Sequence, residues 1–214
     1  MQIALLGTGK MARGIAYGLR DTPHDLTFGS RDAVKAETLA RQMGDENARR
    51  YHGTSLESAA ARADVVFLAL PWSTAVETTR RLREFLDGKI LVDLTNPLTD
   101  GFDDLVTPPD TSGAELIAEA AGPRVRVVAA LKNTFAGTFA EPRIRGLIAP
   151  DVLIAGDDPP AKRDVGRLVE AMGFSGLDAG PLRAARTIER MTVLLIDLAM
   201  RNRWDWNAGF KIVH

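Results

Sequence analysis

The sequence contains no cysteine among its 214 residues. This absence excludes disulfide bonds, thiolate metal sites, iron–sulfur clusters and catalysis by a cysteine nucleophile. Histidine is scarce as well, since the three histidines, His24, His52 and His214, are scattered and lack the spacing of metal ligands. We therefore expect no metal site. The lack of cysteine also fits a cytoplasmic protein, and we expect that location.

The sequence also lacks an excess of one charge and a long apolar run. Lys and Arg number 27 against 28 Asp and Glu, which gives a net charge of −1. This balance argues against a nucleic-acid-binding face and against a protein that binds membrane surfaces. The longest apolar stretch near the C-terminus, residues 191–200, is interrupted by Asp197. It is too short for a membrane-spanning helix, which needs about 20 residues.

The chain does contain a regular alternation of short apolar runs and longer helical patterns, which predict strands and helices respectively. The expected strands are residues 3–6, 25–29, 64–70, 89–94, 124–131, 152–155 and 176–179. The expected helices are residues 11–20, 34–43, 73–86, 161–172 and 184–202, and a further helix should precede the strand at residue 64. Such alternation is typical of βαβ units and predicts an α/β fold with a doubly wound parallel sheet.

A glycine-rich turn directly follows the first expected strand. Gly7, Gly9 and Ala12 match the dinucleotide-binding fingerprint G-x-G-x-x-G/A, between a strand and a helix as the motif requires. The first glycine permits a tight turn, and the second lets a pyrophosphate approach the backbone because it has no Cβ. The helix N-terminus then offers free N–H groups to the anion. Glycines also mark ordinary strand-to-helix turns, so a structural role is the alternative.

The pattern of the chain changes after residues 156–160, and we expect a boundary between two parts near residue 150. Residues 1–150 should form a Rossmann-type dinucleotide-binding domain. Residues 151–214 should form a small α-rich C-terminal lobe, too small to fold alone and packed on the first part. We expect this lobe to contribute to the acceptor site. Its long apolar helix is either core or a subunit interface, and the latter would make the protein a homodimer.

The end of the second expected strand indicates which dinucleotide is bound. A cofactor without a 2′-phosphate usually has its ribose held by Asp or Glu at this point, but Ser30 and Arg31 stand there instead. Ser30 can donate to a phosphate, Arg31 can bind it through two parallel hydrogen bonds, and Lys35 adds a further donor. These residues predict NADP rather than NAD. Asp32 is expected to cap the next helix.

Two further strand ends offer cofactor-binding residues, because ligands of an open parallel sheet bind beyond the carboxyl ends of its strands. At Leu70-Pro71-Trp72, the indole of Trp72 could lie along the ribose or nicotinamide of the cofactor. Alternatively, Trp72 is a packed aromatic residue at a helix start. At Asn96-Pro97, a polar amide stands on a fixed turn near the expected nicotinamide position.

The segment 131–138 follows the next expected strand and mixes apolar and polar residues, as the floor of a pocket does. Lys132, Asn133 and Thr134 are the candidate catalytic residues, which would orient a substrate or relay a proton. A lysine at a strand end is more commonly a surface cation, and this is the alternative for Lys132.

Taken together, these residues resemble the deazaflavin-dependent NADP oxidoreductases, the NADPH–coenzyme F420 reductase family. The resemblance runs in order through almost the whole chain and is most specific at residues 178–182, Asp-Ala-Gly-Pro-Leu. It also includes residues 3–9, Gly14, residues 29–31, Lys35, residues 70–72, 130–131 and 156–158, Leu177, Glu189 and residues 209–212. It implies direct hydride transfer between NADPH and coenzyme F420, in a homodimer.

The resemblance also implies roles for individual residues. The pyrophosphate would be lined by Thr8, Gly9, Lys10 and Met11. The 2′-phosphate would be held by Ser30, Arg31 and Lys35, in agreement with their charge. The nicotinamide half would be bordered by Trp72, Val76 and Ala136.

Two segments depart from the family pattern, and both flank the hydride acceptor. Where the archetypal reductases have a histidine followed by Thr-Ile-Pro, this chain has Lys132-Asn133-Thr134-Phe135, and the segment at residues 96–98 also differs. Hydride transfer between NADPH and F420 is the first hypothesis. One alternative is NADPH-dependent reduction of a C=N, C=C or C=O bond in a small metabolite. The other is a dinucleotide-sensing protein without turnover.

Overall fold

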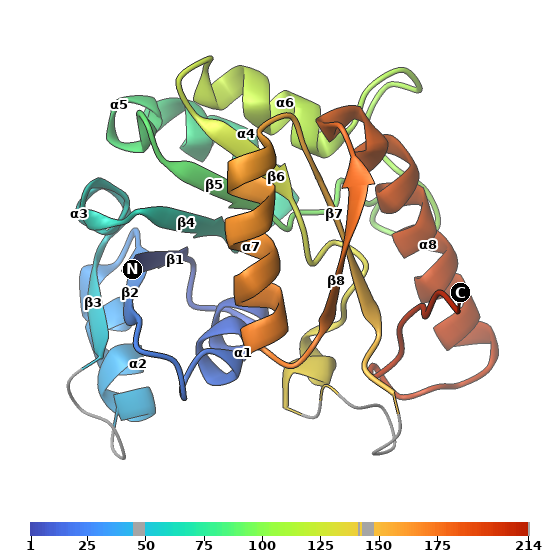
Figure 1. Ribbon diagram of the computed structural model, residues 1–214, viewed down its shortest axis with the longest axis horizontal. Helices are drawn as coiled ribbons and strands as arrows, with labels where there is room; N and C mark the ends of the chain where they lie inside the picture. Colours follow the sequence, from blue (N-terminus) through green and yellow to red (C-terminus); the bar gives the residue numbers. More distant parts are fainter. Residues whose placement is uncertain (45–49, 141, 143–147, 214) are drawn as a thin grey trace.

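A computed structural model describes residues 1–44, 50–140, 142 and 148–213, and its described strands form one sheet (Figure 1). The order across the sheet is β3-β2-β1-β4-β5-β6-β7-β8. The strands are β1 (Gln2–Leu6), β2 (Asp25–Ser30), β3 (Tyr51–Ser55), β4 (Val65–Leu68), β5 (Ile90–Asp93), β6 (Arg126–Ala129), β7 (Asp151–Gly156) and β8 (Ser175–Gly180). The order reverses between β1 and β4, which is where an open α/β sheet binds its ligand.

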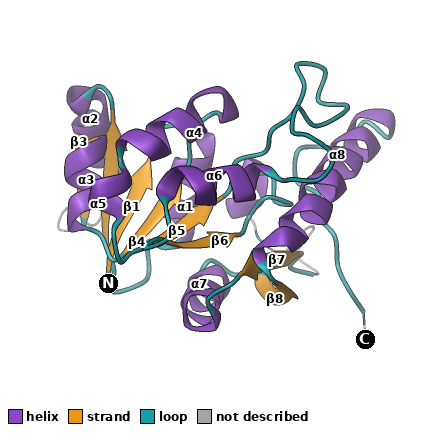
Figure 2. Cartoon of the chain, turned by 90° about the horizontal axis from the view of Figure 1, so that it is seen from above, coloured by secondary structure: helices purple, strands orange, loops and turns teal. Residues whose placement is uncertain are grey.

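Helices cover both faces of the sheet (Figure 2). They are α1 (Lys10–Gly18), α2 (Ala33–Gly44), α3 (Leu56–Arg62), α4 (Trp72–Arg81), α5 (Arg83–Leu86), α6 (Gly113–Ala121), α7 (Pro159–Ala171) and α8 (Ala185–Arg201), with short 3-10 turns η1 (Ala136–Phe139) and η2 (Leu182–Ala184). Helices α1, α2 and α7 share one core cluster, and α3, α4, α6 and α8 share the other. The sheet is therefore doubly wound, as the alternating pattern predicts.

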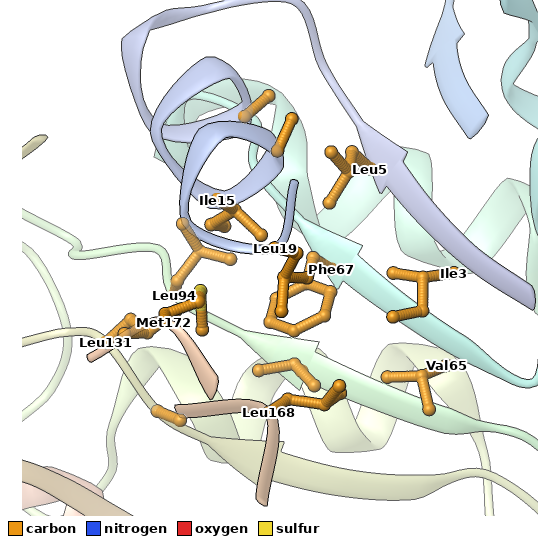
Figure 3. Close-up of a cluster of buried hydrophobic side chains, with 14 of the residues drawn as sticks. Ile3, Leu5, Ile15, Leu19, Val65, Phe67, Leu94, Leu131, Leu168 and Met172 are labelled. Carbon is orange, nitrogen blue, oxygen red and sulfur yellow. The ribbon is translucent and has the colours of Figure 1, made fainter. Parts of the chain in front are cut away.

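Alternate residues of the central strands supply the two cores. In β1, Ile3 and Leu5 belong to the α1 side, whereas Ala4 and Leu6 belong to the other side. Figure 3 shows the first of these cores, where Ile15 of α1 and Leu19 just after that helix lie close to Phe67 of β4. Because both faces are covered, these strands read as continuous apolar runs rather than alternating ones.

The expectation of a wholly parallel sheet is wrong at one position, although the fold class is confirmed. Strands β1 to β6 pair in parallel, but β7 runs antiparallel to β6, with Ala129 opposite Ala155. A parallel return needs a crossover of a dozen or more residues, usually a helix. Between β6 and β7 the described residues contain only the four-residue turn η1. Strand β7 therefore begins at the end of the sheet where β6 finishes, and it runs back in the opposite direction.

Two other differences have local causes. The helix expected over residues 73–86 is broken at Leu82 into α4 and α5. Strand β3 and helix α6 are absent from the expected elements. Strand β3 has no buried residue and therefore no apolar pattern, while the buried face of α6 consists of glycine, alanine and one isoleucine, which indicate a core helix only weakly. Residues 151–214 add β7 and β8 to the same sheet rather than forming a second one.

Candidate functional site

The glycine-rich turn places its two glycines in different environments. Gly7 has φ +130°, and a Cβ there would lie 2.2 Å from the carbonyl oxygen of Ala69. Its N–H donates to the Gly29 carbonyl at 2.8 Å. Gly9 precedes α1, and a Cβ there would meet nothing within 4 Å. The fold therefore requires Gly7, whereas Gly9 leaves free space in front of the helix.

The N-terminus of α1 is open to an anion. No side chain caps it and its first turn contains no acidic residue. Its free N–H groups and partial positive charge therefore face the space beside Gly9. Thr8, Lys10 and Met11 surround this position, with Lys10 exposed and the other two half-buried. This arrangement fits the pyrophosphate of a dinucleotide.

The expected phosphate clamp stands at the carboxyl end of β2. Ser30 ends the strand, and Arg31 and Lys35 are both exposed just beyond it. Asp32 caps the following helix, as predicted, because its Oδ1 accepts from the Lys35 N–H at 3.2 Å. Its carboxylate is thus engaged with the backbone. The clamp residues present a hydroxyl and two cations to the solvent, which fits a 2′-phosphate.

Trp72 and the turn at residues 96–97 meet at the start of α6. A Cβ at Gly113 would lie 3.1 Å from both Trp72 Cζ3 and Pro97 Cδ, so only glycine fits easily there. Trp72 is the first residue of α4 and is half-buried. This contact brings together two strand ends that the sequence could only treat separately. The half-buried Leu70 and Val76 pack against the core on the same side of the sheet.

Lys132 is at the centre of a buried ion network. Its Nζ lies 2.7 Å from Asp93 Oδ2 and 2.9 Å from Glu189 Oε1, and none of the three side chains has exposed surface. It also donates to the carbonyl oxygen of Thr95. The alternative that Lys132 is a surface cation is therefore wrong. Burial alone would lower its pKa, but the two carboxylates outweigh this and raise the pKa above its ordinary value.

Glu189 links this network to the N-terminus of α6. Its carboxylate accepts from the N–H groups of Gly113 at 2.9 Å and of Ala114 at 3.1 Å. These are the first two residues of the helix, whose N-terminal N–H groups otherwise lack partners. The positive end of the helix dipole therefore offsets part of the second negative charge.

The turn after β5 is tied to the same network. Asp93 Oδ1 accepts from the N–H of Thr95 at 2.9 Å and from its hydroxyl at 2.7 Å. Asn96 Nδ2 donates to the Lys132 carbonyl at 2.9 Å. The Oδ1 atom of Asn96 is buried and has no hydrogen-bond partner among the described residues. It is therefore an unsatisfied acceptor beside the network.

The backbone just before Lys132 is strained. Leu131 has φ +59°, a conformation that costs about 1–3 kcal/mol for a residue with a side chain. The neighbouring contacts hold it, since the Lys132 carbonyl also accepts from the Thr192 hydroxyl at 2.9 Å. The sequence gives no sign of this strain because no glycine marks the position.

The other two candidate catalytic residues also lie inside the protein. Asn133 is 1% exposed and bridges to β7: its Nδ2 donates to the Asp151 carbonyl at 2.7 Å, and its Oδ1 accepts from the Leu153 N–H at 3.3 Å. Thr134 is buried beside it. The side chains of all three candidates are thus buried, and those of Lys132 and Asn133 bind other groups of the protein.

A cavity of about 730 Å³ lies beside α1, against the segment after β6. Its apolar wall includes Ala136, Phe139 and Phe135, whose ring meets that of Trp206 edge-on at 5.2 Å. Its opposite wall includes Lys10 and Arg13, which are exposed cations of α1. The cavity therefore combines aromatic surfaces with positive charge. Trp206 was not singled out from the sequence because it lies outside any regular element.

Asp93 and Glu189 are the functional candidates whose roles sequence reasoning missed. Asp93 ends a strand of buried residues, and Glu189 stands beside Ile188 on the buried face of α8. A carboxylate within an apolar pattern indicates that it has a buried partner. This pattern in the sequence could have identified both Asp93 and Glu189. The described residues contain no cluster of His, Cys, Asp and Glu that could hold a metal, nor a helix long and apolar enough to cross a membrane.

Comparison with known proteins identifies the family of this chain. The family profile described as "NADP oxidoreductase coenzyme F420-dependent" matches residues 2–97. The F420-dependent NADP reductase of Methanothermobacter marburgensis is 33% identical over 100% of this chain and 99% of its own. That of Methanocaldococcus jannaschii is 32% identical, again over 100% of this chain and 99% of its own.

A solved structure from Arthrobacter sp. FB24, described as a candidate F420-dependent NADP-reductase, superimposes with a TM-score of 0.86 at 31% identity, covering 100% of both chains. An imine reductase of Streptomyces aurantiacus shares the fold alone, with a TM-score of 0.66 and 17% identity over 95% of this chain and 64% of its own. The match to the Methanothermobacter enzyme spans the whole of this chain, including the glycine turn, the phosphate clamp and the buried network. This chain belongs to the family of the F420-dependent NADP reductases.

Proposed function

We propose that this protein is an NADP-dependent oxidoreductase that transfers hydride between NADPH and coenzyme F420. The observation that carries the proposal is the full-length similarity, at 33% identity, to a protein named for that activity. The geometry supports it, since a phosphate clamp, an open helix N-terminus and a cationic, aromatic cavity lie around the carboxyl edge of one sheet and helix α1.

The chain holds the dinucleotide through its first two βα turns. The N–H groups at the start of α1 bind the pyrophosphate. Ser30, Arg31 and Lys35 bind the 2′-phosphate and so select NADP over NAD. Trp72, Val76 and Ala136 border the nicotinamide, and Asn96 Oδ1 accepts a hydrogen bond from its carboxamide. When bound, NADPH supplies a hydride from its nicotinamide ring.

The cavity beside α1 receives the second reactant. Its aromatic wall offers a surface for a flat ring, and Lys10 and Arg13 attract anionic groups on the same molecule. The protein's contribution is to hold two rings in contact and to exclude water from the space between them. Such a transfer requires no strong general acid, which agrees with the burial of Lys132, Asn133 and Thr134.

A direct assay tests this proposal. The purified protein is mixed with NADPH and oxidised F420, and the absorbances of both compounds are followed over time. We expect both to fall together, in a ratio of one to one, because one hydride reduces one deazaflavin. NADH in place of NADPH serves as the cofactor control. NADPH binding without F420 reduction would contradict the proposal and direct the search to small molecules with C=N, C=C or C=O bonds.

We also propose that the protein is a cytoplasmic homodimer. Leu194 and Met200 on α8 are 51% and 57% exposed, and Trp204 just beyond the helix is 46% exposed. Contact with a second copy of the chain would remove these apolar side chains from water. Light scattering coupled to size-exclusion chromatography would give twice the mass of the chain, and Leu194→Asp should return it to the monomer.

A further inference from the structure

The buried Lys132 network is used by none of the binding contacts proposed above. An ammonium group has three N–H donors, and those of Lys132 are directed at Asp93, Glu189 and the Thr95 carbonyl. No donor is left for a substrate. Its raised pKa also keeps it protonated at neutral pH, so it cannot serve as a base. Lys132 therefore acts on other parts of the protein rather than on a ligand.

The elements that the network joins are those that carry the nicotinamide-side residues. Through Asp93 and its own carbonyl, Lys132 fixes the turn at Thr95 and Asn96. Through Glu189 it fixes the N-terminus of α6. Gly113 at that N-terminus touches Trp72 and Pro97, with 3.1 Å between its Cβ position and each ring. The network thus holds the turn at Thr95 and Asn96 directly, and it supports Trp72 through the N-terminus of α6.

The charges of the network make this support rigid. One cation and two carboxylates leave a net negative charge, which the N–H groups of Gly113 and Ala114 help to offset. Removing Lys132 would leave two buried carboxylates without their cation. Removing the charge of Glu189 would leave the N–H groups of Gly113 and Ala114 without a charged acceptor. Buried charges held this close together restrict the arrangement of the three side chains more than an apolar contact would.

We propose that Lys132, Asp93 and Glu189 are positioning residues for hydride transfer, which set Trp72 and Asn96 against the nicotinamide. The proposal rests on the proposed function. Hydride transfer depends steeply on the separation and alignment of the two rings, and a displacement of about 1 Å can cost about 100-fold in rate. The adenosine and pyrophosphate half of the dinucleotide is bound by the glycine turn and the clamp, which the network does not touch.

Two variants and one control test the proposal. Glu189→Gln keeps the size of the side chain and removes its charge, and Lys132→Met removes the cation. The control is Lys89→Met, since Lys89 is bound to the carbonyls of Ala61 and Ala63 at the opposite end of β5. Folding of each variant is checked by circular dichroism, and Glu189→Gln decides the test if Lys132→Met does not fold.

We expect Glu189→Gln to lower kcat with F420 about 10- to 100-fold, while KM for NADPH changes less than about threefold. The pH profile of kcat should keep its shape, and Lys89→Met should behave as the wild type. A Glu189→Gln variant that unfolds at a lower temperature but keeps the wild-type kcat would overturn the proposal. So would the loss of one limb of the pH profile, which would make Lys132 a proton donor.

A second readout separates this proposal from the proposed function. The fluorescence of bound NADPH reports the surroundings of the nicotinamide without any acceptor. If the wild type fails to reduce F420, the proposed function fails, and the emission spectra then decide the positioning role. A shifted or weakened emission in Glu189→Gln at saturating NADPH supports it, and a spectrum identical to that of the wild type overturns it.

Discussion

The two sides of the site are built in opposite ways. The dinucleotide side consists of consecutive residues, with Gly7 and Gly9 in one turn and Ser30, Arg31 and Lys35 in the next, and its cations are exposed. The nicotinamide side consists of Trp72, Asn96 and a network that joins β5, α6 and α8, and its charges are buried. The first side binds through local geometry, while the second depends on the whole fold.

The largest expected effect sharpens this contrast on the buried side. Lys132→Met should cost about 3–5 kcal/mol of unfolding free energy, because two buried carboxylates lose their cation. The variant Lys132→Met/Glu189→Gln should lose less than the sum of the two single variants, by about 0.5–3 kcal/mol. Urea unfolding of the three variants measures this. Strictly additive losses would mean that the two residues do not act as a unit.

Gly7→Ala should destabilise the protein by about 2–4 kcal/mol. The new Cβ would lie 2.2 Å from the Ala69 carbonyl oxygen, and the backbone would keep a φ of +130°. Thermal unfolding without cofactor gives the result. A melting temperature equal to that of the wild type would show that the turn can relax around the side chain.

Gly9→Ala should separate binding from folding within the same motif. Its Cβ meets no protein atom within 4 Å, so stability should stay within about 0.5 kcal/mol of the wild type. NADPH affinity should nevertheless fall about tenfold or more, since the Cβ occupies the approach of the pyrophosphate. Calorimetric titration with NADPH gives the affinity. Unchanged binding would assign Gly9 a structural role only.

Arg31→Ala should discriminate between the two cofactors. Loss of a charged hydrogen-bonding partner costs about 1.5–3 kcal/mol, which corresponds to a 10- to 100-fold weaker affinity for NADPH. The affinity for NADH should change less than about threefold, because it has no 2′-phosphate. Arg41→Ala, which removes an exposed arginine from the following helix α2, is the control. Equal losses for both cofactors would contradict the clamp.

The smallest effect comes from an exposed ion pair on the helix that also carries Glu189. Arg201 and Asp197 of α8 lie 2.7 Å apart and are exposed to the solvent. Arg201→Ala should cost only about 0.3–0.5 kcal/mol by urea unfolding, because water and salt screen the pair. A loss as large as that of Lys132→Met would remove the distinction between the exposed and the buried charges.

The same contrast explains what could be predicted from the sequence. The α/β fold, the glycine turn and the cap at Asp32 follow from residues close together in the chain, and the structure agrees with each. The direction of β7 could not be predicted, because it depends on a connection without a crossover helix. The partners of Lys132 could not be predicted either, because Asp93 and Glu189 are distant in sequence and meet only after the sheet forms.

The most direct test of this division of labour compares Arg31→Ala and Glu189→Gln in one steady-state experiment with NADPH and F420. We expect Arg31→Ala to raise KM for NADPH with little change in kcat, and Glu189→Gln to lower kcat with little change in that KM. If both variants change the same parameter, the two sides of the site are not separate, and binding and positioning depend on one common structure.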